Sequence, residues 1–82
     1  MNIEIGSVVK ALAGREKGSI YVAVGQDGGF VYLADGKERK LERPKRKSMK
    51  HISPVICVID TAGLTNKKLR KLIMNLKPKD QD

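Results

Sequence analysis

The sequence is poor in the residues that build disulfides, metal sites and membrane spans. Of its 82 residues only one is cysteine, none is tryptophan, and aromatic residues make up 4%. A single cysteine forms no internal disulfide and supplies no cysteine-based zinc site. No apolar run approaches the roughly 18–20 residues of a membrane-spanning helix, and residues 1–6 lack the basic start and apolar stretch of a signal peptide. We therefore expect one small cytoplasmic domain without a membrane partner.

Basic residues are abundant and unevenly distributed. The chain carries 17 Lys and Arg against 9 Asp and Glu, a formal net charge of +8. Residues 1–36 are nearly neutral. In the segment 37–50 only Glu38 and Glu42 are acidic, and the basic residues are Lys37, Arg39, Lys40, Arg43, Lys45, Arg46, Lys47 and Lys50. A second basic group follows residue 66, at Lys67, Lys68, Arg70, Lys71, Lys77 and Lys79. Such clustering is typical of proteins that bind a polyanion, above all a nucleic acid.

Alternating and valine-rich apolar segments predict a mainly β domain. The expected strands cover residues 7–12, 19–24, 30–34 and 55–60, with a further short strand at 51–52. A charged loop at 13–18 separates the first two strands, and its glycines, Gly14 and Gly18, permit the positive φ that such a tight turn needs. A hairpin connection around Asp27, Gly28 and Gly29 separates the next two. In the basic segment, Pro44 limits regular strand pairing, and Leu41 is the lone apolar anchor.

Side-chain alternation assigns faces to two of these strands. In the strand 19–24, Ile20, Val22 and Val24 share one face, and Tyr21 and Ala23 share the other. In the strand 30–34, Phe30 and Tyr32 lie opposite Val31 and Leu33. Aromatic residues on a sheet either stack unpaired bases or fill the core. We expect Phe30 in the core and leave both interpretations open for the two tyrosines.

The last predicted element is a helix over residues 65–77. Apolar residues recur at the spacing of one helical face, at Leu69, Leu72, Ile73 and Leu76. Thr65 is the expected N-cap and Pro78 the expected stop. The domain then consists of a small barrel over residues 1–60, with about five strands, and this helix packed on or beside it.

No arrangement of residues predicts catalysis, a metal site or a cofactor. His51 has no acidic partner nearby in the sequence, and Cys57 lies among apolar neighbours as a buried, inert thiol would. The spacing from Gly14 to Gly18 is too short for a phosphate-binding P-loop and lacks its Lys-Ser/Thr. We therefore expect a protein that is not an enzyme.

The segment from Ile5 to Gly18 resembles the KOW motif, in which a glycine-containing basic loop joins two strands. The resemblance continues through residues 31–36 and the basic residues after Pro44 to Ile52, where the chain is similar to short bacterial KOW-domain RNA-binding proteins. These are related to large-subunit ribosomal proteins of archaea and eukaryotes. The resemblance implies an SH3-like β-barrel of about five strands that binds RNA, commonly ribosomal RNA. It implies RNA contacts from Arg15 and Lys17 in the first loop and from the basic segment at Lys45, Arg46, Lys47 and Lys50.

Charge and resemblance together predict a non-enzymatic, monomeric protein that binds ribosomal or other structured RNA, with the ribosome or a ribosomal protein as a further expected partner. Phosphate neutralisation by Lys and Arg dominates such binding. The expected RNA-binding residues are Arg15, Lys17, Lys37, Arg39, Lys40, Arg43, Lys45, Arg46, Lys47 and Lys50. We expect the two basic loops to meet at one edge of the barrel, Lys45 and Lys47 to point together, and the start of the helix to stand apart. The alternative is a protein-interaction module that docks an acidic ribosomal or transcription partner.

Overall fold

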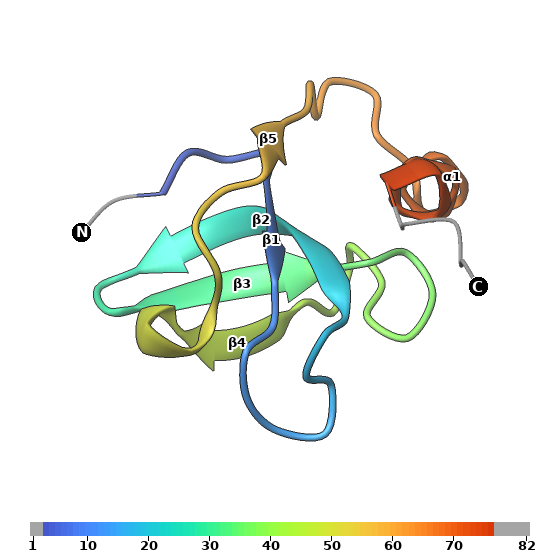
Figure 1. The fold of residues 1–82 in the computed structure, drawn as a ribbon. Helices are drawn as coiled ribbons and strands as arrows, with labels where there is room; N and C mark the ends of the chain where they lie inside the picture. The colour runs from blue at the N-terminus through green and yellow to red at the C-terminus, as the bar shows by residue number, and fades with distance from the viewer. Residues whose placement is uncertain (1–2, 77–82) are drawn as a thin grey trace.

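One antiparallel sheet and one C-terminal helix make up the fold, in a computed structural model that describes residues 3–76 (Figure 1). The elements are β1 (Ser7–Lys10), β2 (Ile20–Asp27), β3 (Phe30–Ala34), β4 (Lys45–Ser48), the 3-10 helix η1 (Met49–His51), β5 (Cys57–Val58) and α1 (Asn66–Leu76). Hydrogen bonds join the strands in the order β4-β3-β2-β1-β5. The predicted mainly β fold with a C-terminal helix is confirmed.

The first three predicted strands are present, and the later ones differ. β2 runs on to Asp27, which pairs with Phe30, so the hairpin turn shortens to Gly28 and Gly29. The strand expected at 51–52 is wrong, because His51 ends η1 and Ile52 makes only an isolated bridge to Ala11. Of the strand expected at 55–60, only the two residues of β5, Cys57–Val58, are in a strand.

Strand β4 was not predicted. It lies in the basic segment, directly after Pro44, and pairs with β3 along its whole length, from Phe30↔Ser48 to Leu33↔Lys45. Proline has no backbone N–H to donate, but here it precedes a strand at the edge of the sheet, where it breaks no ladder hydrogen bond. The apolar pattern gave no signal for this strand because β4 contains no apolar residue.

Alternation along the strands builds a separate core on each face of the sheet. The helix-side core contains Val8, Ile20, Val22 and Ala34 from the sheet together with Leu69 and Ile73 of α1. The opposite core contains Val9, Ala11, Tyr21, Ala23, Val31 and Leu33. The predicted division of β2 between its two faces is therefore confirmed, with Val24 packed partly against the helix-side core.

The aromatic residues follow the same alternation. Tyr21 belongs to the opposite core and is 4% exposed. The expectation that Phe30 fills the core is wrong, because Phe30 is 37% exposed. With Val31 and Leu33 turned into the opposite core, Phe30 must face the other way, at the end of β3 near the hairpin turn. Tyr32 shares that face and is half-buried.

The sheet is strongly twisted, and β1 crosses β2 and β3 at a steep angle (Figure 1). After η1 the chain returns along the free side of β1. The Leu12 amide donates to the His51 carbonyl, and the Ser53 amide donates to the Lys10 carbonyl, at 2.8 and 2.9 Å. β1 is thus flanked by β2 on one side and by residues 51–58 on the other. β4 and β5 are the two outermost strands in the order.

Helix α1 begins as expected and is tied to the loop that joins β3 to β4. Thr65 caps it, since its hydroxyl accepts a hydrogen bond from the Lys68 amide at 3.1 Å. The Asn66 side chain accepts from the Leu41 amide (2.8 Å) and donates to the Glu42 carboxylate (2.9 Å). The expectation that the helix start stands apart from the basic loop is therefore wrong.

The rest of the predicted helix is confirmed in part. Leu69 and Ile73 are buried, Leu72 is half-buried, and Leu76 is exposed at the end of the described helix. Residue 77 and the predicted stop at Pro78 lie outside the described residues. Within residues 3–76, no helix has the length and apolar character needed to cross a membrane.

Candidate nucleic-acid interface

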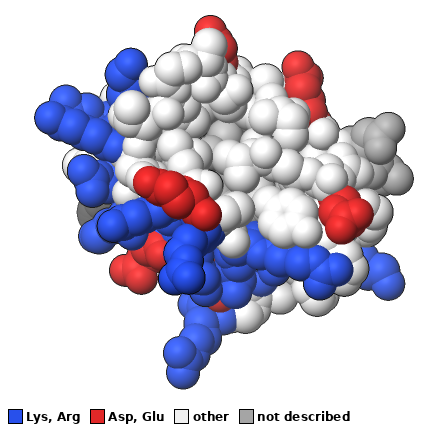
Figure 2. All heavy atoms as spheres, turned by 180° about the vertical axis from the view of Figure 1, so that it is seen from behind, with Lys and Arg blue, Asp and Glu red and all other residues white. Residues whose placement is uncertain are grey.

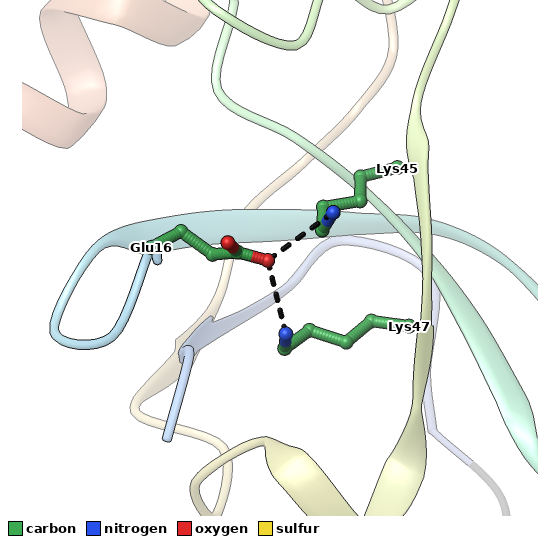
Figure 3. A network of polar contacts seen from close by, with 3 residues as sticks. All are labelled: Glu16, Lys45 and Lys47. Carbon is green, nitrogen blue, oxygen red and sulfur yellow. Dashed lines mark hydrogen bonds and ion pairs between the residues drawn. The ribbon is translucent and has the colours of Figure 1, made fainter. Parts of the chain in front are cut away.

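A carboxylate from the first loop binds two lysines of β4 (Figure 3). Glu16 Oε2 lies 3.0 Å from Lys47 Nζ and 3.3 Å from Lys45 Nζ. The two lysines point together because they alternate with Arg46 along the strand. Their partners on β3 are Leu33 and Val31, so the lysine stems leave the strand on the face of the opposite core. The first loop and the basic residues after Pro44 thus meet, as expected. The contact is made by Glu16, an acidic residue to which the sequence assigned no role.

This ion-pair network is partly buried and shifts the ionisation of Glu16. The side chains of Lys47 and Glu16 are 9% and 19% exposed. The hydrogen bond from Lys47 is the main reason that the pKa of Glu16 falls from 4.5 to about 2, and the bond from Lys45 adds to it. Burial acts in the opposite direction but is outweighed. At neutral pH one carboxylate therefore neutralises half of the charge of two lysines that were expected to bind RNA.

The first loop has the tight form that its glycines predicted. Gly14 and Gly18 have φ angles of +86° and +91°, in the left-handed region that side chains disfavour. The Gly18 amide closes the loop by donating to the Ala11 carbonyl at 2.8 Å. This conformation leaves Arg15 and Lys17 exposed on either side of the half-buried Glu16.

The second basic loop, residues 35–44, is shaped by neutral and acidic groups. Asp35 Oδ1 accepts hydrogen bonds from the Lys37 and Arg39 amides, at 2.9 and 2.8 Å. Leu41 packs against the helix-side core, so its expected anchoring role is confirmed. The cations of this loop are exposed, and their side chains make no ion pair within residues 3–76: Lys37, Arg39, Lys40 and Arg43.

Gly36 explains why the loop lies against the helix. Its φ is +80° and it is buried against the Asn66 carbonyl at the start of α1, so that any Cβ at this position would collide with that oxygen. Because the loop packs against the start of α1, the exposed cations of the helix lie near those of the loop. These helix cations are Lys67, Lys68, Arg70 and Lys71. Figure 2 shows Lys and Arg gathered along two sides of one face, with acidic groups among them, and a largely uncharged area beside them.

The remaining predicted residues lie elsewhere. Arg46 pairs with Tyr32 and lies on the same face of the sheet as Phe30, with its guanidinium carbon 3.7 Å from the centroid of the Phe30 ring. Lys50 is exposed in η1, and its amide donates to Ser48 Oγ at 3.2 Å. Within residues 3–76, neither side chain makes a hydrogen bond or an ion pair with the first loop.

A cleft of about 310 Å³ lies between the two loops. Its lining residues come from the first loop, the second loop and the strands beside them: Arg15, Glu16, Ser19, Tyr21, Asp35, Glu38, Arg39 and Lys45. Three of the ten predicted RNA-binding residues, Arg15, Arg39 and Lys45, meet here. Burial of the Tyr21 side chain, with Asp35 and Glu16 nearby, raises the pKa of its hydroxyl.

Neither a metal-ligand cluster among the described residues nor a match to a known protein assigns a function to this region. Within the described residues, no three side chains of His, Cys, Asp or Glu gather as a metal site would require. A comparison with models of known protein families finds no match for the sequence, and a comparison with curated proteins finds none either. The resemblance to KOW proteins therefore stays a prediction based on the residues given above.

Proposed function

We propose that this chain is a non-enzymatic, cytoplasmic RNA-binding protein that recognises ribosomal or other structured RNA as a monomer. Its sheet would be a KOW-type, SH3-like barrel, with the two loops at one end forming the RNA-binding edge. Support for the barrel comes from the opposite core, where side chains of β1, β2 and β3 pack together with Met49 and Ile52 from the segment that follows β4.

The observation that carries the proposal is the group of exposed cations on the loop 35–44, which make no ion pair within residues 3–76. A small domain gains nothing in stability from Lys37, Arg39, Lys40 and Arg43 at close range, because like charges repel. Arg15 and Lys17 add two more on the loop across the cleft. Cations held on ordered backbone neutralise phosphates and release counterions, which supplies most of the affinity of nonspecific nucleic-acid binding.

Shape rather than sequence is the property that such a surface recognises. Lys and Arg that reach phosphates fix the position of the protein on the RNA without reading its bases. Double-stranded RNA is bound in this way, through its backbone and 2′-hydroxyl groups. The surface therefore suits a folded RNA with closely spaced phosphates.

The test is the salt dependence of binding to a labelled ribosomal RNA hairpin, followed by fluorescence anisotropy. We expect the logarithm of the affinity to fall linearly with the logarithm of the salt concentration. Each phosphate contact contributes a slope of about one. An affinity that hardly changes with salt would contradict the proposal.

A second measurement separates RNA binding from docking to an acidic protein. The tagged protein is sedimented through a gradient of cell lysate, with and without ribonuclease treatment. An RNA-bound protein leaves the large particles after ribonuclease treatment. A protein that stays with them is held by a protein partner, and the RNA proposal is then wrong.

A further inference from the structure

The cleft between the two loops differs in charge from the surface around it. Its cations, Arg15, Arg39 and Lys45, are balanced by the carboxylates of Glu16, Asp35 and Glu38. A phosphate placed here would meet as many negative as positive groups, so it gains little by Coulomb attraction. The cleft is better matched to a neutral group that offers both hydrogen-bond donors and acceptors.

Two of the carboxylates retain free acceptor capacity. Asp35 uses Oδ1 for the Lys37 and Arg39 amides, and no hydrogen bond within residues 3–76 engages Oδ2. Glu38 is exposed, and its carboxylate has no hydrogen bond or ion pair among the described residues. Glu16, by contrast, is occupied by Lys45 and Lys47. The acceptors available to a ligand therefore come from the loop 35–39.

The arginines supply the complementary donors. Arg15 comes from the first loop and Arg39 from the second, and neither makes an ion pair within the described part of the chain. A guanidinium group donates two parallel hydrogen bonds, and it also stacks on the face of a base. Tyr21 lines the cleft but is too buried to offer its ring for stacking.

We propose that the cleft binds one unpaired guanine base of the RNA. Guanine presents O6 and N7 as acceptors on one edge, which is the pair that arginine recognises best. Its N1–H and N2 amino group form two adjacent donors on the Watson–Crick edge, which a carboxylate can accept. The other bases lack this combination, since adenine and cytosine offer only one amino group and uracil has a single imino donor. This inference rests on the proposed RNA binding and adds base specificity to it.

The experiment compares four short oligouridylates that differ in their central nucleotide, which is guanosine, adenosine, cytidine or uridine. Binding is measured by anisotropy at one fixed salt concentration with the complete chain. We expect about tenfold tighter binding of the guanosine oligomer, a factor within the range by which a well-placed bidentate contact discriminates between bases. Inosine, which lacks the N2 amino group, should bind with an intermediate affinity.

Two variants with matched controls locate the preference. Glu38→Gln removes the exposed carboxylate, and Asp35→Asn keeps the Oδ1 acceptor that shapes the loop. Both should reduce the preference for guanosine several-fold. Glu4→Gln and Asp27→Asn make the same changes of charge at exposed positions outside the cleft, and they should leave the preference unchanged.

The outcomes separate this inference from the proposed function. Equal affinities for all four oligomers, together with salt-dependent binding of the RNA hairpin, would overturn the guanine site and leave RNA binding standing. A guanosine preference that persists in both cleft variants would also overturn it. If neither the oligomers nor the hairpin bind, both proposals are wrong.

Discussion

The basic segment 37–50 divides at Pro44 into two halves that use their charge differently. In the first half, the loop is shaped by Asp35, Gly36, Leu41 and Asn66, and its cations are exposed without partners among the described residues. In the second half, two of the cations are themselves part of the fold, because Lys45 and Lys47 bind Glu16. A run of similar residues in sequence therefore contains both exposed cations, which we propose bind RNA, and cations that form part of the fold. Stability and RNA affinity should respond differently to changes in each half.

The largest effect on stability is expected at Gly36. Gly36→Ala forces a side chain into a positive φ and against the Asn66 carbonyl, and we expect it to lower the free energy of unfolding by about 2–3 kcal/mol. Gly18→Ala is the matched control, because Gly18 has a similar φ of +91° with open space around it. It should cost about 1 kcal/mol. Urea denaturation measures both, and equal losses would show that the loop does not depend on its contact with α1.

The next effect separates a structural lysine from an exposed one. Lys47→Ala removes a side chain that is 9% exposed, together with its bond to Glu16, and should cost about 1–2 kcal/mol. Lys40→Ala, in the exposed half, should change stability by less than about 0.5 kcal/mol. Equal unfolding midpoints for the two variants would refute the division into halves.

RNA affinity should show the reverse order. Lys37→Gln with Lys40→Gln removes two exposed charges and should weaken hairpin binding by about tenfold, with a salt slope smaller by about two. Lys45→Gln with Lys47→Gln makes the same chemical change where Glu16 already neutralises part of the charge. It should reduce the slope by less than one, measured at a temperature where the variant is folded. A larger loss from the strand pair would place the phosphate contacts on β4.

The sequence predicted what depends on local pattern. Alternation in β2 correctly assigned Ile20 and Val22 to one core and Tyr21 to the other, and Thr65 was recognised as a cap. Each of these follows from neighbours within a few residues. The positive φ of Gly14 and Gly18 was also expected from the short charged loop between two strands.

What the sequence missed depends on contacts between distant segments. β4 exists because β3 offers an edge to pair with, and its composition of cations hides that role. Glu16 looks like one charge in a polar loop, and only folding brings it to Lys47, 31 residues further along the chain. Asn66 reaches Leu41 and Glu42 across 25 and 24 residues. Phe30 is exposed because it lies at the hairpin end of β3, on the face of Ala34 but outside the helix-side core. Alternation alone does not decide how far along a strand a core extends.

The smallest expected effect is the dependence of stability on pH that the ionisation of Glu16 causes. The pKa of Glu16 is lowered from 4.5 to about 2 by Lys47 and Lys45, so the folded state favours the ionised carboxylate. The stability that it contributes is complete above pH 4.5 and is lost as the pH falls toward about 2. At neutral pH, Glu16→Gln should cost less than about 1 kcal/mol, because the network is partly solvated. Glutamine resembles the protonated acid, so the difference in urea midpoint between the two proteins should shrink steadily as the pH falls through this range. A difference that stays constant from neutral pH down to about 2 would mean that Glu16 does not hold the two lysines.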